Sequence, residues 1–169
     1  MEWIDLDSRA CSVARTLEIV GDRWTLLILR DVFNGVRRFA DLQRHLGIAR
    51  NVLTQRLTAL VDAGVLVRIP YQEPGARRRH EYEPTDRGRE LLSVLLTIIA
   101  WGDRHLADAS GPPVHVRHTE CGTDVRLVPI CEAGHAITSP SEVMIEPGPG
   151  ARPASQSPSA STQPPTPRQ

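Results

Sequence analysis

The sequence contains no lysine and only three cysteines, and each shortage narrows what the protein can be. All 20 basic side chains are arginines, whose planar guanidinium can bind phosphate or guanine through two hydrogen bonds. A GC-rich genome would give the same bias, so the absence of lysine alone indicates no partner. An odd and small number of cysteines argues against a disulfide framework and fits a reducing compartment.

Long hydrophobic runs and enzyme motifs are also absent. The longest apolar run, residues 91–101, is far shorter than the roughly 20 residues of a membrane-spanning helix. The segment MEWIDLDSRAC is acidic and lacks the apolar stretch of a signal peptide, so we expect a cytoplasmic protein. No glycine-rich phosphate loop, nucleophile elbow or recognisable pair of acids is present, which argues against catalysis.

Charge is distributed unevenly although the formal net charge is zero. Residues 37–79 contain nine arginines against three acids, Asp41, Asp62 and Glu73. Such a local excess of positive charge is suited to the phosphates of a nucleic acid.

Periodicity and turn residues predict an α+β, mainly α fold in three parts. Residues 7–108 read as four helices, a β-hairpin and a long helix over about 85–107. The first helix is expected to start at Asp7 or Ser8, the second at Asp22, and the fourth to open without a cap at Ala49. Residues 114–145 read as a small β-like module. Residues 146–169, rich in proline and serine, are expected to be disordered.

The fourth helix has the side chains of a base-reading element. At about 100° per residue, its leucines fall on one side and Asn51, Gln55 and Thr58 on the other, with Thr54 on the flank. The amides of Asn51 and Gln55 can bond adenine, and the threonines can contact phosphate or a thymine methyl group. The alternative is an amphipathic helix whose polar face is merely solvated.

The hairpin that follows combines alternating apolar residues with an arginine-rich tip. Its strands, LVRIPYQ and HEYEPT, flank the tip EPGARRR, where Gly75 permits the turn. Pro70 and Pro84 restrict the strands to an edge position or to strand ends. The tip reads either as a wing that grips the DNA backbone and minor groove or as a solvated loop.

The long C-terminal helix is apolar almost all round. Leu91 to Trp101 is interrupted only by Ser93 and Thr97, so the helix needs partners on more than one side. One partner is its own domain, and the other could be a second copy in a two-fold dimer that matches two half-sites. A helix buried in a monomeric core is the alternative.

The motifs GDRWTLLILRD, RRF, LTQRL, AGVL and EPTDRGREL, in this order, resemble the HxlR-type winged helix-turn-helix transcriptional regulators, which are related to MarR-like proteins. The resemblance covers about residues 9–105 and implies a dimeric, sequence-specific DNA-binding repressor or activator without catalysis. It departs at Ala49, where the family commonly has serine. The predicted DNA-binding residues are Arg37, Arg38, Arg50, Asn51, Thr54, Gln55, Arg56, Thr58, Arg77, Arg78 and Arg79.

A protein-interaction or RNA-binding adaptor is the competing interpretation, because residues 114–145 exceed the minimal domain. Phenylalanine and tyrosine total only four, which argues against an RNA-binding sheet with stacking aromatics. A small-molecule or oxidant effector would be a further partner, and its identity is not written in the sequence.

Cysteines and histidines suggest two further sites. Cys11 lies near Arg9 and Arg15 at a helix start, which favours a reactive thiolate, and the resemblance implies redox sensing at this position. A small buried hydrophobe is the alternative. The second site is a predicted zinc site with four ligands in two pairs, and each pair has the short spacing of a zinc knuckle. A metal-free hairpin is the alternative. Its candidate ligands are His118, Cys121, Cys131 and His135.

Overall fold

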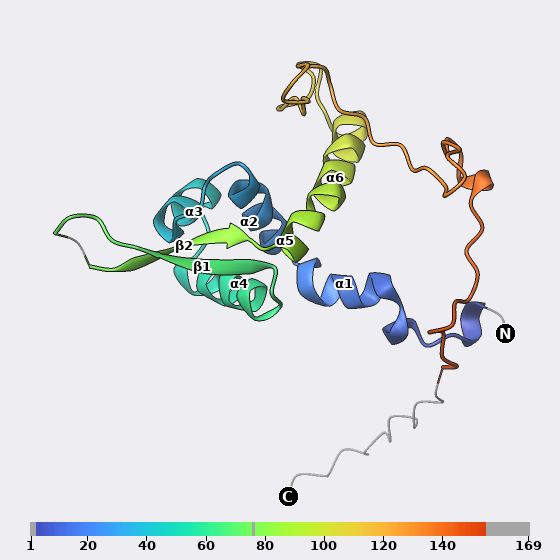
Figure 1. Ribbon diagram of the computed structural model, residues 1–169, viewed down its shortest axis with the longest axis horizontal. Coiled ribbons are helices and arrows are strands. Elements are labelled where there is room, and N and C mark those ends of the chain that lie inside the picture. Colours follow the sequence, from blue (N-terminus) through green and yellow to red (C-terminus); the bar gives the residue numbers. More distant parts are fainter. Residues whose placement is uncertain (1–2, 76, 155–169) are drawn as a thin grey trace, which may run out of the picture. The chain divides into compact units, whose positions relative to one another are not determined.

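The computed structural model describes residues 3–75 and 77–154 (Figure 1). The chain forms two compact units, the larger of which spans residues 16–144. The helices of the winged domain are α1 (Ser12–Val20), α2 (Arg23–Phe33), α3 (Phe39–Leu46), α4 (Arg50–Asp62), α5 (Asp86–Glu90) and α6 (Leu92–His105). Within the described ranges, no helix is long and apolar enough to cross a membrane.

Two of the helix boundaries follow capping residues that are visible in the sequence, whereas the first helix begins later than predicted. The Asp22 carboxylate accepts a hydrogen bond from the backbone N–H of Trp24 at 2.9 Å and so begins α2. Gly47, in the left-handed conformation with φ 61°, ends α3. The prediction for the first helix was wrong, because Asp7 caps a separate 3-10 turn, Ser8–Ala10. The backbone of Cys11 is extended, and α1 therefore begins only at Ser12.

The predicted hairpin is confirmed as the antiparallel strands β1 (Leu66–Tyr71) and β2 (Arg79–Pro84). On the other edge of β2, the backbone N–H of Tyr82 donates to the carbonyl of Arg37 at 2.9 Å. The segment before α3 thus pairs with β2 and leaves β1 on the outside. This outer place tolerates Pro70, which has no N–H to donate.

The core lies between α2, α3, α4 and the base of the hairpin. Leu53, Leu57 and Leu60, which share one side of α4, are at most 1 % exposed. They join a buried cluster of residues from the neighbouring elements, including Ile28, Leu29, Val32, Leu42, Val65 and Leu66. Burial of this apolar side fixes the rotation of α4 about its axis, and its polar side consequently faces outward.

The helix predicted over residues 85–107 is broken into α5 and α6 at Leu91. At the start of α5, Thr85 donates from its hydroxyl to the carbonyl of Gly64 at 2.6 Å and accepts from the N–H of Gly88 at 3.0 Å. Gly88 is buried against the carbonyl of Val65. These contacts join α5 to the turn between α4 and β1.

Helix α6 has three apolar sides rather than the two that the sequence suggested. Leu95 is buried in the core, whereas Leu96 and Ile99 face the segment 112–127. A third side, with Ile98 and Trp101, is exposed. The apolar composition of α6 therefore reflects packing against both the domain and the C-terminal module.

The module over residues 114–145, all of which the structure describes, is not built from strands. It contains two isolated bridges, Arg117 with Asp124 and Ile130 with Ala136, and a 3-10 helix, Pro140–Glu142. The β-like character predicted for this module is thus limited to these two isolated bridges.

The smaller unit joins the N-terminal segment to part of the predicted tail. The N–H of Asp7 donates to the carbonyl of Arg152 at 2.8 Å, and the N–H of Ala154 donates to that of Asp5 at 2.7 Å. Residues 152–154 are therefore paired, contrary to the expectation of disorder. The remainder of that prediction, residues 155–169, lies outside the described residues.

We predict that Gly88→Ala destabilises the domain by about 2 kcal/mol, because an added Cβ would lie 2.1 Å from the carbonyl oxygen of Val65. Urea unfolding followed by circular dichroism measures this loss. Gly102→Ala in α6 is the matched control, since its Cβ would meet no atom within 4 Å. The control should leave stability unchanged or raise it slightly. Equal stability of the two variants would contradict the packing described for Gly88.

Candidate nucleic-acid interface

The outward side of α4 gathers five of the predicted DNA-binding residues. Together they line one shallow, open depression, formed by Arg50, Asn51, Thr54, Gln55 and Thr58. Asn51 and Gln55 are exposed, and neither amide has a hydrogen-bond partner among the described residues. Their donors and acceptors are therefore available to an external ligand.

The two threonines on this surface are partly engaged. The Thr54 hydroxyl donates to the carbonyl of Arg50 at 2.9 Å, which leaves its methyl group outward. The Thr58 hydroxyl accepts from the guanidinium of Arg68 on β1 at 3.3 Å. Arg68 is a residue that the sequence reasoning missed. The strand period places it on the same side of β1 as buried Leu66, but its approach to Thr58 depends on how the hairpin packs against α4.

Arg56 was grouped with these residues, but the structure places it elsewhere. Its guanidinium lies 3.1 Å from the carboxylate of Asp22, the residue that begins α2. The Nε atom is buried without a hydrogen-bond partner. Arg56 follows Gln55 in the sequence, so its side chain points about 100° away from that of Gln55 around the helix axis. It therefore lies at the border between the exposed and the buried side of α4. Its role here is to join α4 to the start of α2.

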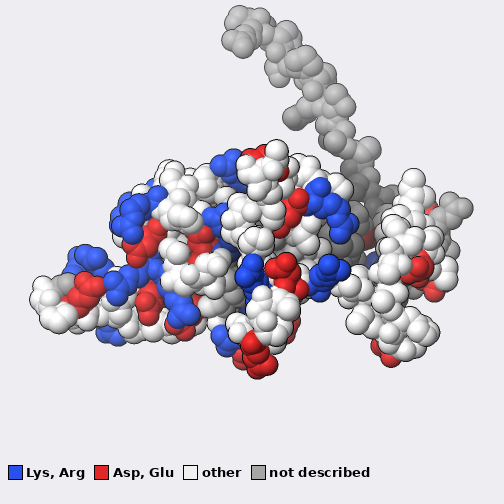
Figure 2. Space-filling model, turned by 90° about the horizontal axis from the view of Figure 1, so that it is seen from above, with Lys and Arg blue, Asp and Glu red and all other residues white. Residues whose placement is uncertain are grey.

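Two other predicted residues, Arg37 and Arg38, are paired with acids of the wing. Arg37 forms an ion pair with Glu83, and Arg38 lies 2.7 Å from Glu73 and stacks over the ring of Tyr71 at 4.4 Å. Desolvation opposes the charge on Arg38, but the hydrogen bond that its guanidinium donates to Glu73 and the nearby Tyr71 raise its pKa overall. Figure 2 shows basic and acidic side chains interleaved at the wing end. The positive count over residues 37–79 thus overstates the free charge.

The arginines of the wing tip remain available. Arg77, Arg78 and Arg79 are exposed and have no ion pair within the described ranges. The same holds for Arg50 at the start of α4, whose guanidinium lies 5.1 Å from the centre of the Phe39 ring. Uncompensated positive charge is therefore found at the wing tip and at one end of α4, which suits contacts to phosphate.

A buried carboxylate that the sequence reasoning missed holds α2 to α3. Asp31 is 2 % exposed and lies 2.7 Å from the guanidinium of Arg30 and 2.6 Å from Nδ1 of His45 on α3. A buried charge is costly unless it has an ion-pair partner and hydrogen bonds. Asp31 is stabilised by its ion pair with Arg30 and its hydrogen bond with His45. An aspartate in the apolar stripe of α2 was the available signal.

The predicted zinc ligands do not come together. The Cys121 sulfur lies 3.4 Å from Nδ1 of His118 and 2.9 Å from the Thr123 hydroxyl, whereas Cys131 and His135 are joined only by a backbone hydrogen bond. Among the described residues, no three metal-binding side chains form a group that could hold an ion. The structure therefore does not assemble the four predicted ligands into one site, and zinc binding stays a prediction. The spacing within each pair suits zinc, but the two pairs do not come together.

Cys11, the candidate sensor, is half-buried and immediately precedes α1. Its carbonyl accepts from the N–H of Arg15 at 3.0 Å, so the residue does lie at a helix start. Arg9, expected as a neighbouring cation, instead binds the carboxylate of Asp7 at 3.0 Å.

A buried apolar side on α4, an exposed polar side with free amides, and an arginine-tipped hairpin define a winged helix-turn-helix domain of the DNA-binding type. The chain belongs to the HxlR-like helix-turn-helix family, whose model matches residues 19–110. It is thus an HTH-type transcriptional regulator, not an enzyme, and the family match gives no support to the RNA-binding adaptor interpretation.

Individual proteins show the same relationship. The chain is 48 % identical over 141 residues to an uncharacterized HTH-type transcriptional regulator of Mycobacterium tuberculosis, covering 82 % of this chain and 87 % of that protein. It is similar to the crystal structure of PA1607, with a TM-score of 0.72, 34 % identity, and coverage of 83 % and 99 % of the two chains. The redox regulator HypR in its oxidized form matches at TM-score 0.52 and 27 % identity, over 58 % of this chain and 100 % of that one.

We predict that Cys121 is alkylated by iodoacetamide several-fold faster than Cys11 or Cys131. Hydrogen bonds from the Thr123 side chain and backbone lower the pKa of the Cys121 thiol, which raises its thiolate fraction near neutral pH. Cys121 is also exposed, whereas the other two are half-buried. Peptide mass spectrometry over a time course measures the three rates. Thr123→Val should slow Cys121 alone, and an unchanged rate in that variant would contradict the stated cause.

Proposed function

We propose that this protein is a homodimeric, sequence-specific DNA-binding regulator that places α4 in the major groove of each half of an inverted repeat. The observation that supports this most strongly is the single surface formed by Arg50, Asn51, Thr54, Gln55 and Thr58 on the exposed side of α4. The major groove admits one α-helix, and amides held on that helix can form paired bonds with adenine.

Phosphate contacts would supply most of the affinity. The hairpin extends beyond the helical core (Figure 1), and its tip carries Arg77 to Arg79, which have no ion pair among the described residues. They would lie along the backbone and minor groove beside the α4 site, while Arg50 and Arg68 contact phosphates at the edge of the major groove. Arg37 and Arg38 could join them only by exchanging Glu83 and Glu73 for phosphate. A regulator bound to chromosomal DNA acts in the cytoplasm.

The exposed side of α6 supports the dimer. Val94, Ile98 and Trp101, spaced four and three residues apart, are 38 %, 47 % and 58 % exposed. These positions recur on one face of a helix, and a contiguous apolar face of this kind is typical of a protein–protein interface. A second copy packed on the same face would give a two-fold dimer with two copies of α4 about one DNA turn apart.

We propose redox control through Cys11 as an addition to this function. Cys11 immediately precedes α1 and is half-buried, and the similar protein HypR is a redox regulator. Oxidation at Cys11 would act by changing the separation of the two α4 helices.

We predict that Gln55→Ala weakens binding to the preferred operator by about tenfold and binding to random duplex hardly at all. Arg78→Ala should weaken both DNAs together and reduce the slope of affinity against salt by about one. Fluorescence anisotropy with both duplexes at several salt concentrations measures these effects.

Gln43→Ala on α3 is the matched control, since it removes the same side chain from a helix outside the proposed base-reading surface. It should leave the ratio of operator to random affinity unchanged. An equal loss on both duplexes for Gln55→Ala would exclude Gln55 from the base-reading residues.

We predict that Ile98→Glu yields a folded monomer with weakened operator binding, because a charge placed in the exposed apolar face of α6 opposes its burial in a dimer. Light scattering after size exclusion gives the mass. Val143→Glu, at an apolar residue with 48 % exposure in the C-terminal module, should leave the dimer intact. A wild-type chain that is monomeric, or a dimer that survives Ile98→Glu, would contradict this interface.

A further inference from the structure

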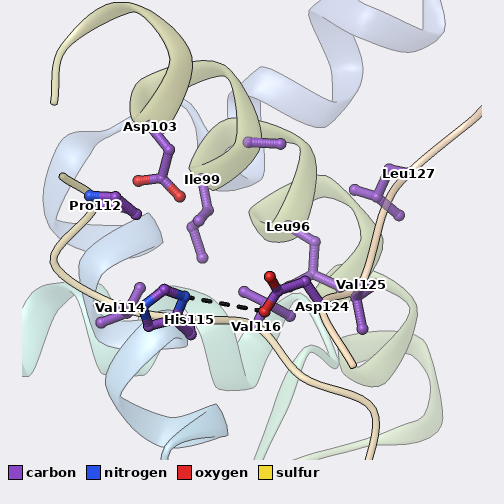
Figure 3. A pocket seen from close by; sticks show the side chains of 11 residues that line it. Leu96, Ile99, Asp103, Pro112, Val114, His115, Val116, Asp124, Val125 and Leu127 are labelled. Carbon is purple, nitrogen blue, oxygen red and sulfur yellow. Dashed lines mark ion pairs between the residues drawn. The ribbon is translucent and has the colours of Figure 1, made fainter. Parts of the chain in front are cut away.

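A cavity of about 180 Å³ lies between α6 and the segment 112–127 (Figure 3). Its walls are largely apolar, formed by Leu96 and Ile99 from the helix and by Val114, Val125 and Leu127 from the segment. An apolar cavity of roughly 150 Å³ is large enough for benzene, so this one can hold a compact organic molecule with one ring. The DNA interface uses none of these residues.

One polar group at this cavity has no partner. Asp103, half-buried on α6, has neither a hydrogen bond nor an ion pair among the described residues. In Figure 3 its carboxylate lies beside Ile99 and Pro112, at one end of the cavity. A carboxylate next to apolar walls loses hydration without gaining a compensating donor, and a cationic donor would supply that compensation.

At the other end of the cavity, the negative charge of Asp124 already has basic partners. Asp124 lies 3.9 Å from Nδ1 of His115, as the dashed line in Figure 3 marks, and 3.6 Å from Nε of Arg117. An anionic ligand would meet two carboxylates, Asp103 and Asp124, and would be disfavoured. The uncompensated charge is therefore that of Asp103 alone, and it selects a ligand with one positive group.

We infer that this cavity binds a small organic cation, an amine with a single apolar ring or short alkyl body. The body contacts the aliphatic walls, and the ammonium group donates to the carboxylate of Asp103. Apolar contact and one charge-assisted hydrogen bond together define the ligand class.

The position of the cavity makes its ligand an effector. Leu96, Ile99 and Asp103 fall on the side of α6 opposite to Ile98 and Trp101, which belong to the proposed dimer face. A ligand that packs on one side of this helix can shift the packing of the other, and with it the separation of the recognition helices. This regulatory role rests on the proposed function, whereas binding of the cation does not.

Calorimetric titration of the full chain without DNA tests the site, with benzylamine as the cationic probe and benzyl alcohol as its neutral counterpart. We expect benzylamine to bind about tenfold more tightly, as one hydrogen bond to a charged group would provide. Asp103→Asn should lower the affinity for benzylamine to that for benzyl alcohol and leave the latter unchanged. The unchanged alcohol affinity also shows that the variant retains the cavity.

Glu120→Gln is the matched control, because Glu120 is an exposed acid of the C-terminal module that does not line the cavity. It should keep the preference for benzylamine. Equal affinities for the two probes, no binding of either, or the same loss in both variants would each overturn the inference. Because the assay contains no DNA, such a failure is distinguishable from a failure of the proposed DNA binding.

Discussion

The contact of Gly88 and Thr85 with the turn after α4 is the constraint on which the arrangement of this domain depends. Gly88 approaches the carbonyl of Val65 so closely that no side chain fits, and the Thr85 hydroxyl binds the carbonyl of Gly64. The end of the recognition helix, the base of the wing and the start of the C-terminal helices therefore meet at one point. The Thr85 hydroxyl and the close approach of Gly88 to the Val65 carbonyl thus join α5, which directly precedes α6, to the end of α4.

Around this junction, buried apolar side chains and ion pairs together hold the helices in place. Leu53 and Leu57 bury one side of α4, and the ion pair between Arg56 and Asp22 fixes its flank, so that the opposite side must face outward. The buried Asp31 holds α3 to α2 in a similar way through His45. Rigid support of this kind lowers the entropic cost of binding, because the reading side chains stand on a helix already held in place.

Much of the fold could be predicted from the sequence because its determinants are local. The spacing of the leucines in α4 and the Asp22 cap act within a few residues of the elements that they define. Other features depend on contacts distant along the chain. The inward turn of Arg56, the approach of Arg68 to Thr58 and the packing of the C-terminal module on α6 all require elements whose relative positions no periodicity reveals. A zinc site would likewise need distant segments to meet, and local spacing near Cys121 and Cys131 does not bring three metal-binding side chains together among the described residues.

The central claim is that one side of α4 contacts the DNA bases and thereby recognises the sequence, while the arginines contact the phosphates of the DNA backbone. The most direct measurement is the affinity of the purified protein for the intergenic DNA upstream of its own gene, compared with scrambled duplex of equal length over a range of salt concentrations. The account predicts tight binding with a preference for the natural sequence that persists as salt rises, because base contacts depend less on counterion release than phosphate contacts do. Weak and equal affinity for the two duplexes would contradict it and leave only a general attraction to polyanions.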